Sequence, residues 1–295
     1  MPIEDADSSK PPIKKVGFII RKNCQRCSRI VERIVDIAPK DWAIMYEREV
    51  GKYLPVKSKD IENIEADLII SVGGDGTVLW ALQHKNCPIL GINMGGLGFL
   101  SEVEIGEIES SIYELARGNY RIERSRKLSV FLNGQRLEDC TNEVIVHSSK
   151  IAKIRKFLIS TPNSFIDRVA ADAVIVATPV GSTSYSFSAG GPILMPSLDA
   201  VVVSYIAPFA SRSRPIVLPM GTDIKIRVLD KNQDCIVILD GQVEYRMKST
   251  DEIVIKTSEN YAEFILKRLI CREGYTSYQL VKMILKGLSS LKKYL

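Results

Sequence analysis

The stretch from Asp67 to Leu82 constrains the fold more than any other part of this 295-residue chain. An apolar run, Leu68-Ile-Ile70, leads into Gly73-Gly-Asp-Gly-Thr77 and then into an apolar segment, Val78-Leu-Trp-Ala-Leu82, that is typical of a helix. Three glycines in four positions let the backbone approach a ligand closely and adopt positive φ angles. A buried strand that turns directly into a helix is typical of α/β proteins.

The same turn, residues 73–77, predicts a ligand. Backbone N–H groups at the start of a helix attract phosphate oxygens. A carboxylate among phosphates would repel them, so Asp75 indicates a general base or a metal ligand beside a bound nucleotide. The alternative is a plain strand–helix turn in which Asp75 caps the helix, and Thr77 fits either a cap or a phosphate contact.

Strands and helices alternate over residues 14–121. Apolar runs predict strands at 16–20, 42–46, 68–72 and 88–92. Apolar side chains at helical spacing predict two helices, one with Ile30, Val31, Ile34, Val35 and Ile37 and one with Ile108, Ile112 and Leu115 that Gly118 closes. We therefore expect an α/β N-terminal domain with a Rossmann-like parallel sheet. Ligands of such sheets bind beyond the carboxyl ends of the strands, where loop 73–77 and a second glycine-rich loop, 93–100, both fall.

The pattern changes after Arg121. Residues 127–132 alternate, Asn133-Gly134 is a strong hairpin signal, and 135–137 would be the return strand. Further strand candidates follow at 143–147, 156–160, 165–169, 173–177, 200–205, 224–229, 236–239, 253–256 and 264–266. Many strands with few helices predict an all-β C-terminal domain over residues 122–266.

The two chain ends differ from the domains. Residues 1–13 are polar and contain prolines, so we expect a disordered tail rather than a signal peptide. Tyr278 to Leu295 has the apolar face of an amphipathic helix. Its lysines would suit a membrane surface, but a docked terminal helix is the more common explanation.

Charge and composition exclude some functions. The net charge of +5, from 40 basic and 35 acidic residues, is small for a nucleic-acid binder, so anionic small molecules are the expected partners. The longest apolar stretch, Ala200 to Ile206, is too short to span a bilayer, which favours a cytoplasmic protein without a membrane partner. Among six cysteines, only Cys24 and Cys27 have metal or redox spacing, and no second pair completes a zinc site. We expect two ordinary thiols and no disulfide framework.

A hydroxyl-rich segment is the second informative stretch. The strand before it ends at Thr178-Pro179, and the segment Gly181-Ser-Thr-Ser-Tyr-Ser-Phe-Ser188 is followed by Gly190-Gly-Pro192. Its short hydroxyl side chains supply donors and acceptors around a ligand, and Tyr185 offers a flat face to a base. The segment lacks the second glycine of a nucleophile elbow, and the chain has only two histidines, so a Ser–His–Asp triad is not favoured.

Three other positions stay open between a structural and a functional role. Phe99 fits a core anchor or one wall of a base pocket. Asn142-Glu143 fits a solvated strand start or a hydrogen-bonding pair for ribose hydroxyls or an amide. Asp240-Gly241-Gln242 fits a plain turn or a ligand contact.

In order and spacing, these motifs resemble the NAD kinase family, which phosphorylates the 2′-hydroxyl of the adenosine ribose of NAD. The similar stretches cover most of residues 14–275 and are 73–77, 93–100, 142–143, 172–193, 213–219 and 240–242. The Gly-Gly-Asp-Gly motif is shared with diacylglycerol-type lipid kinases and, less closely, with phosphofructokinases. The segment from Thr178 to Tyr185, with Gly190-Gly-Pro192, is much more specific to NAD kinases.

The resemblance implies roles by position. Asp75 would be the general base that accepts the proton of the ribose 2′-hydroxyl. Gly74 and Gly76 would bring N–H groups to the phosphates of ATP or polyphosphate, with Mg²⁺ neutralising the donor. The other expected nucleotide-binding residues are Thr77, Asn93, Phe99, Asn142, Glu143, Asp172, Thr183, Ser184, Tyr185, Ser188 and Gln242. No residue is assigned as a metal ligand.

The resemblance also implies a homodimer or homotetramer and a terminal segment, 267–295, that packs back on the first domain. Two positions depart from the family pattern. Ala170 stands where a basic residue is common, so a phosphate contact is either absent or supplied by Arg168 from another face, and Ser184 replaces the usual alanine. A lipid kinase and a non-catalytic NAD(P) sensor are the competing interpretations.

Overall fold

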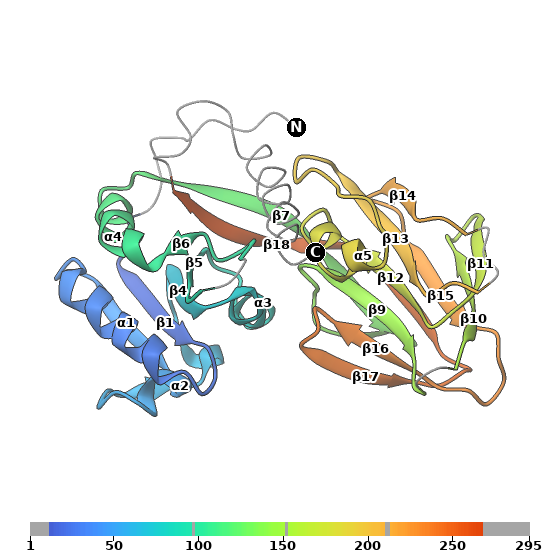
Figure 1. Ribbon diagram of the computed structural model, residues 1–295, viewed down its shortest axis with the longest axis horizontal. Helices are drawn as coiled ribbons and strands as arrows, with labels where there is room; N and C mark the ends of the chain where they lie inside the picture. Colours follow the sequence, from blue (N-terminus) through green and yellow to red (C-terminus); the bar gives the residue numbers. More distant parts are fainter. Residues whose placement is uncertain (1–11, 96–97, 151–152, 210–212, 268–295) are drawn as a thin grey trace, which may run out of the picture. The chain divides into compact units, whose positions relative to one another are not determined.

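A computed structural model of the chain describes residues 12–95, 98–150, 153–209 and 213–267 (Figure 1). The chain divides into two compact units. The described residues of unit 1 are 12–124 and 262–267, and those of unit 2 lie within 125–261. The predicted tail, except for Pro12 and Ile13, and the predicted terminal helix lie outside the described residues.

Unit 1 alternates strands with helices along the chain. Its elements are β1 (Lys15–Ile20), α1 (Gln25–Ile37), β2 (Ala43–Glu47), α2 (Arg48–Gly51), β3 (Ser58–Lys59), η1 (Ile61–Asn63), β4 (Leu68–Gly73), α3 (Asp75–His84), β5 (Ile89–Asn93), β6 (Val103–Glu104), η2 (Ile105–Glu107) and α4 (Ile108–Ala116). The strands pair in the order β3-β2-β1-β4-β5, all in parallel, and β6 adds to β5. The predicted parallel sheet is confirmed.

Helices cover both faces of this sheet (Figure 1). Along β4, Leu68 and Ile70 enter a core cluster with α1 and α4, whereas Ile69 enters another with α3. This follows from the alternation of side chains along a strand. Both faces are therefore apolar, as in buried parallel sheets.

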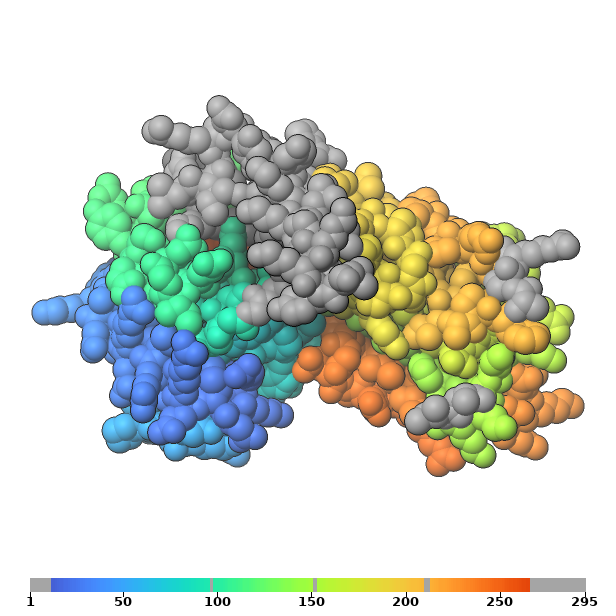
Figure 2. All heavy atoms as spheres, in the orientation of Figure 1, coloured from blue at the N-terminus to red at the C-terminus, as the bar shows by residue number. Residues whose placement is uncertain are grey.

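Helix α1 shows how closely the sequence pattern sets the packing. Its buried residues include Cys27, Ile30, Val31 and Ile34, which recur at helical spacing. The opposite side of the helix is exposed, and the first part of the chain lies on the surface in Figure 2 (blue). Ile37 was predicted to share the apolar face, but this last helical residue is 42% exposed. Among the described residues, no helix combines the length and the apolar character needed to cross a membrane.

Unit 2 is built mainly from strands. The remaining elements in chain order are β7 (Tyr120–Leu132), β8 (Gln135–Arg136), β9 (Glu143–Ser148), β10 (Arg155–Ser160), β11 (Phe165–Ala171), β12 (Ala173–Ala177), η3 (Gly181–Thr183), α5 (Tyr185–Ser188), β13 (Ala200–Ile206), β14 (Ile216–Pro219), β15 (Ile224–Val228), β16 (Cys235–Leu239), β17 (Val243–Met247) and β18 (Glu252–Lys267). Strands β7 and β18 belong partly to unit 1. Because the division falls inside two continuous strands, no turn residue marks it in the sequence.

Two antiparallel sheets form unit 2. One has the strand order β14-β13-β12-β9-β16-β17, and the other contains β11-β10-β15-β18 together with β7 and β8. Val144 and Val176 from the first sheet share one buried cluster with Phe157 and Ile253 from the second. The sheets therefore pack face to face around a common core, and the β-rich second domain is confirmed.

The turn at Asn133-Gly134 forms as predicted. Asn133 has φ +49° and Gly134 φ +80°, and Leu132 pairs with Gln135 across the turn. Both turn residues therefore adopt the left-handed conformation that a two-residue type I′ hairpin requires.

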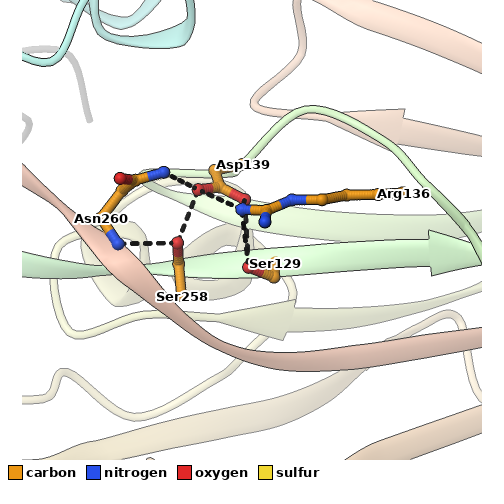
Figure 3. Close-up of polar contacts among 5 residues, drawn as sticks. All are labelled: Ser129, Arg136, Asp139, Ser258 and Asn260. Atoms are coloured by element: carbon orange, nitrogen blue, oxygen red, sulfur yellow. Dashed lines mark hydrogen bonds and ion pairs between the residues drawn. The ribbon is translucent and has the colours of Figure 1, made fainter.

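A polar cluster ties β7 to β18 within unit 2 (Figure 3). The Asp139 carboxylate accepts hydrogen bonds from Ser258 Oγ at 2.5 Å, Asn260 Nδ2 at 2.8 Å and Arg136 Nη2 at 3.1 Å. Ser129 Oγ, from β7, lies 3.1 Å from the same carboxylate. The side chain of Asp139 is only 8% exposed, so these donors replace the water that it has lost.

Candidate functional site

The two glycine-rich loops of unit 1 start from neighbouring strands. Gly73, at the end of β4, pairs with Asn93, at the end of β5, and Met94 N–H donates to Gly73 O at 2.9 Å. As predicted, the loops lie side by side at the carboxyl edge of the parallel sheet. This is the edge at which ligands of such sheets bind.

The first loop opens α3 without positive φ angles. Gly74 is the N-cap, with φ −129° and ψ −172°, and Asp75 is the first helical residue. The expected positive φ angles are therefore wrong for this loop, and the alternative in which Asp75 caps the helix is ruled out. Glycine is required at position 73 for a steric reason instead, because a Cβ atom there would lie only 2.4 Å from Thr77 Oγ1. A Cβ atom on Gly74 would meet no atom of the described residues within 4 Å, so within this part of the chain the position is open.

The Asp75 carboxylate binds the second loop. Its Oδ2 accepts from Phe99 N–H at 2.7 Å, and its Oδ1 accepts from Leu100 N–H at 3.0 Å and from both N–H and Oγ–H of Ser101, at 3.0 and 2.9 Å. A carboxylate oxygen offers two lone pairs. Among the described contacts, Oδ1 is therefore saturated, whereas Oδ2 can accept one more hydrogen bond.

Ser101 and Gly91 support this arrangement, although neither was predicted from the sequence. A Cβ atom on Gly91 would lie 2.7 Å from the Cα of Ser101, so only glycine lets the second loop lie against β5. The position of Ser101, directly after the predicted loop 93–100, is the one sequence signal that could have indicated its role.

Asn93 and Phe99 shape the second loop. Asn93 Oδ1 accepts from Gly95 N–H at 3.0 Å, and Gly95 has φ +110°, a conformation that favours glycine. Phe99 is half-buried, and among the described residues it joins none of the core clusters, in contrast to Leu100. Residues 96–97 of this loop lie outside the described residues.

A disulfide lies at the same sheet edge, after β1. Cys24 and Cys27 are bonded, with their Cα atoms 5.3 Å apart, so the prediction of two ordinary thiols is wrong. Cys24 caps α1, where its Sγ accepts from Cys27 N–H at 3.2 Å. Spacing alone could not separate a thiol pair from a disulfide, because both suit Cys-x-x-Cys at a helix start.

In unit 2, Asp240 organises the start of β9, where Asn142 directly precedes Glu143. Its carboxylate accepts three backbone N–H groups, from Thr141 at 2.8 Å, Asn142 at 2.7 Å and Glu143 at 3.1 Å. Burial raises the pKa of Asp240 to about 6, even though the three donors and the charge of Lys127 favour the ionised form. Asp240 therefore fixes the start of β9 from a neighbouring turn.

Glu143 is buried with half of its carboxyl group unpaired. Oε1 accepts from Ser184 Oγ at 3.3 Å, whereas Oε2, like Asn142 Oδ1, is buried without a hydrogen-bond partner among the described residues. Burial, and then the charge of Asp240, raise the pKa of Glu143 to about 8. Buried polar atoms usually have partners, so these two oxygens are free to bind a ligand.

The hydroxyl-rich segment is seated on these residues. Thr178 Oγ1 donates to Thr141 O at 2.6 Å and accepts from Gly181 N–H at 3.1 Å. A Cβ atom on Gly181 would lie 2.1 Å from Asn142 O, so the contact requires glycine. The segment thereby brings Ser184 to Glu143.

The remaining predicted site residues of the hydroxyl-rich segment and Gln242 are partly or fully exposed. Thr183 Oγ1 donates to Val180 O at 3.0 Å, Tyr185 is 43% exposed, and Ser188 is exposed. Gln242 is exposed and closes a turn through Leu239 O.

Asp172 lies at the opposite end of β12 from this cluster. Ala177, at one end of β12, pairs with Glu143, whereas Ala173, next to Asp172, pairs with His147. Arg168 and Ala170 are two residues apart on β11, so they share one face, and the idea that Arg168 acts from another face is wrong.

A metal cage is not evident at either cluster. No three His, Cys, Asp or Glu side chains converge among the described residues. Asp75 supplies one carboxylate, and such a site suits Mg²⁺ that takes most of its ligands from water and from substrate phosphates. The residues present therefore fit a metal that binds together with the phosphate donor.

Known proteins share both units. The profile of the ATP-NAD kinase N-terminal domain matches residues 16–120, and that of the ATP-NAD kinase C-terminal domain matches residues 141–267. An NAD kinase of Thermoplasma acidophilum is 52% identical over 251 residues, which cover 85% of this chain and 92% of that protein.

Two solved structures have the same fold. An NAD kinase from Archaeoglobus fulgidus in complex with ATP aligns with a TM-score of 0.70 at 28% identity, over 91% of this chain and 99% of that chain. Yeast NADH kinase complexed with NADH aligns with a TM-score of 0.83 at 21% identity, over 95% and 88% of the two chains. The chain therefore belongs to the NAD kinase family.

Proposed function

We propose that the protein transfers the terminal phosphoryl group of ATP to the 2′-hydroxyl of the adenosine ribose of NAD, which gives NADP and ADP. The observation that carries the proposal is the Asp75 carboxylate. Four donors fix it beside the start of α3, and among the described contacts one lone pair of Oδ2 stays open toward a further donor. This is the geometry that a general base needs.

In the proposed reaction, Asp75 Oδ2 accepts the proton of the ribose 2′-hydroxyl. The ribose oxygen forms a bond to the terminal phosphorus of ATP, the bond between that phosphorus and the bridging oxygen breaks, and ADP leaves. Phosphoryl transfer depends mainly on positioning and charge stabilisation. A positioned base contributes roughly 10²–10⁴-fold to the rate.

The start of α3 is the proposed phosphate site. Thr77 and Val78 N–H groups donate to Gly74 O, whereas the N–H groups of Asp75 and Gly76 precede the first intrahelical bond. No described residue crowds Gly74, so phosphates can approach the backbone there. Mg²⁺ bound to the donor would neutralise part of the phosphate charge.

The NAD site is proposed to lie on unit 2. Asn142 Oδ1 and Glu143 Oε2 are buried acceptors without a protein partner among the described residues, and ribose hydroxyls are suitable donors. Around them we assign Thr183, Ser184, Tyr185, Ser188 and Gln242 to NAD. Asp172 stays assigned to NAD, although it lies at the other end of β12.

Several expectations remain predictions. Polyphosphate as an alternative donor, a homodimer or homotetramer, a cytoplasmic location and domain boundaries at 121/122 and 266/267 all belong to this group. They rest on the family resemblance and on the sequence pattern.

The decisive experiment is incubation of the protein with ATP, MgCl₂ and NAD. A dehydrogenase that uses NADP but not NAD reads out the product, and we expect NADP to accumulate with the protein. Tight NADP binding without NADP formation would favour a sensor. Transfer of phosphate to diacylglycerol instead would favour a lipid kinase.

A further inference from the structure

Arg21 lies beside the proposed phosphate site. It follows β1, which pairs in parallel with β4, and its N–H donates to Val72 O at 3.0 Å. A Cβ atom on Gly73 would lie 3.1 Å from the Cβ of Arg21, so the side chain starts next to the first glycine loop. Arg21 is exposed, so its guanidinium group is accessible from solvent beside this loop.

A phosphate donor at this edge needs a cation. The loop itself contributes neutral N–H groups and the negative charge of Asp75, which repels phosphate. A guanidinium group offers five N–H donors in a planar arrangement that matches phosphate oxygens. Arg21 therefore supplies the charge that the loop lacks.

The neighbouring disulfide controls what else Arg21 can bind. Arg21 Nη2 lies 3.8 Å from Cys24 Sγ, and Cys24 is bonded to Cys27. A disulfide sulfur is neutral and a weak acceptor, so it leaves the guanidinium available. After reduction, a Cys24 thiol at the start of α1 beside Arg21 would favour the thiolate, which binds a guanidinium strongly.

We propose that Arg21 binds the terminal phosphates of the donor and that the Cys24–Cys27 pair is a redox switch that sets its availability. The inference rests on the proposed function. In the oxidised protein Arg21 binds ATP. In the reduced protein the Cys24 thiolate competes for Arg21 and repels phosphate, so ATP binds more weakly.

The reductant is a dithiol. One of its thiolates attacks Cys24 Sγ. Cys24 is the more exposed residue of the pair, with an exposed fraction of 6% against 0% for Cys27. The Cys24–Cys27 bond breaks, a mixed disulfide forms, and Cys27 leaves as a thiolate that takes up a proton. The second thiol of the reductant then displaces Cys24, so two electrons reach the protein and the reductant becomes a cyclic disulfide.

The first arm of the test compares Arg21→Ala with Lys22→Ala, because Lys22 is the next residue and is also exposed. We expect Arg21→Ala to raise KM for ATP about 10- to 100-fold, the range for a lost charged hydrogen bond, and to leave KM for NAD unchanged. Arg21→Lys should restore part of the loss, and Lys22→Ala should match the wild type. An unchanged KM for ATP in Arg21→Ala, or equal changes for both substrates, would overturn the assignment.

The second arm adds dithiothreitol. We expect reduction to raise KM for ATP about three- to fivefold in the wild type, as for a competing ion pair, and to have no effect in Arg21→Ala. The Cys24→Ser/Cys27→Ser variant forms neither disulfide nor thiolate, so it should behave like the oxidised protein. If it behaves like the reduced protein, loss of the cross-link rather than thiolate capture moves Arg21, and the switch is wrong as stated.

A fluorescent ATP analogue, titrated without NAD, separates this inference from the proposed function. Binding that depends on Arg21 and on reduction, without NADP formation, would refute the kinase function and leave the inference standing. NADP formation, together with binding of the ATP analogue that does not depend on Arg21, would support the kinase function and refute the inference. The same titration also serves as the readout if the double serine variant folds poorly, because the wild type can be reduced and reoxidised.

Discussion

At the scale of single residues, two carboxyl groups have opposite surroundings. Asp75 is half-buried and held by four donors from the second loop. Glu143 is buried, accepts one hydrogen bond at 3.3 Å, and has a pKa raised to about 8. Environments that differ in this way suit the same functional group to different chemistry, and in the proposed function Asp75 is the proton acceptor and Glu143 a ligand-binding acid.

The raised pKa of Glu143 predicts a pH-dependent stability. Between its ordinary value of 4.5 and about 8, the folded protein holds a proton that the unfolded chain releases, so stability falls as pH rises. Asp240 acts in the same direction only up to about pH 6. From pH 6.5 to 8, we expect the free energy of unfolding to fall by roughly 1–2 kcal/mol through Glu143 alone.

Glu143→Gln, which resembles the protonated acid, should abolish this decline. Urea unfolding of both proteins at several pH values measures it, and Glu244→Gln, an exposed acid in the same unit, is the control. Parallel curves for the wild type and Glu143→Gln would show that Glu143 is ionised in the folded protein.

At the scale of elements, apolar periodicity predicted most strands and helices. It failed at β14 and β17, which are the two edge strands of the six-stranded sheet and alternate half-buried with exposed residues. It also split β18 into two strands, because the polar stretch 257–261 interrupts the apolar pattern of one continuous strand. Pairing and packing with neighbouring strands, rather than local composition, determine that these segments form strands.

The candidate site was predictable where a backbone requirement left a glycine or a short polar residue. The two loops, Asn142-Glu143 and the hydroxyl-rich segment were found in this way. Ser101 and the role of Asp240 were not, because Ser101 donates to the Asp75 carboxylate and Asp240 accepts backbone N–H groups, in both cases across a long stretch of sequence. Long-range hydrogen bonds of this kind leave no local pattern.

In the first glycine loop, replacement by alanine should have different effects at the two neighbouring positions Gly73 and Gly74. Gly73→Ala would place a Cβ atom 2.4 Å from Thr77 Oγ1, so we expect it to lower Tm and activity together. Gly74→Ala meets nothing within 4 Å at a φ that alanine tolerates, so it should keep Tm and raise KM for ATP. Thermal unfolding with steady-state kinetics separates the two; a Tm loss in Gly74→Ala would contradict an open phosphate site.

The Asp139 cluster predicts a stability effect (Figure 3). Burial raises the pKa of Asp139, but donors from Ser258, Asn260 and Arg136 outweigh it and hold the pKa below its usual range. The carboxylate is therefore stabilising above its ordinary pKa, and the stability is lost on acidification. We expect Asp139→Ala to cost about 2–4 kcal/mol at neutral pH.

Glu259→Ala is the control for Asp139→Ala. Glu259 lies on β18 between Ser258 and Asn260, but its side chain is exposed. Denaturant unfolding of both variants measures the difference. Equal effects would indicate that the cluster adds nothing beyond a surface contact.

At the scale of the whole molecule, exposed aromatic residues on unit 2 support the predicted self-association. Phe165 is 65% exposed and begins β11, which is an edge strand. Phe209 is 66% exposed, and its N–H donates a hydrogen bond to the backbone oxygen of Ala170 on β11. Edge strands with exposed apolar residues are typical sites of association.

We expect sedimentation equilibrium to give at least twice the chain mass of 32.9 kDa. Phe165→Ser with Phe209→Ser should shift the protein toward the monomer, because Phe165 lies on β11, Phe209 is hydrogen-bonded to β11, and both changes remove exposed apolar area. Tyr113→Ser, at a 57% exposed aromatic residue of unit 1, should leave the mass unchanged. A monomeric wild type would contradict the prediction.

The central claim is that Asp75 accepts the proton of the ribose hydroxyl. An asparagine there keeps one oxygen for the N–H groups of residues 100–101 but turns an N–H₂ group toward Phe99 N–H, so the loop is also disturbed. Ser101→Ala removes one donor and keeps the carboxylate, which makes it the control for loop disturbance.

The most direct measurement is therefore the single-turnover rate of NADP formation by Asp75→Asn with ATP and NAD both bound. We predict binding of both ligands close to that of the wild type and a rate roughly 10²–10⁴-fold lower, whereas Ser101→Ala should lose about tenfold or less. A rate in Asp75→Asn equal to that of Ser101→Ala would contradict the proposed base.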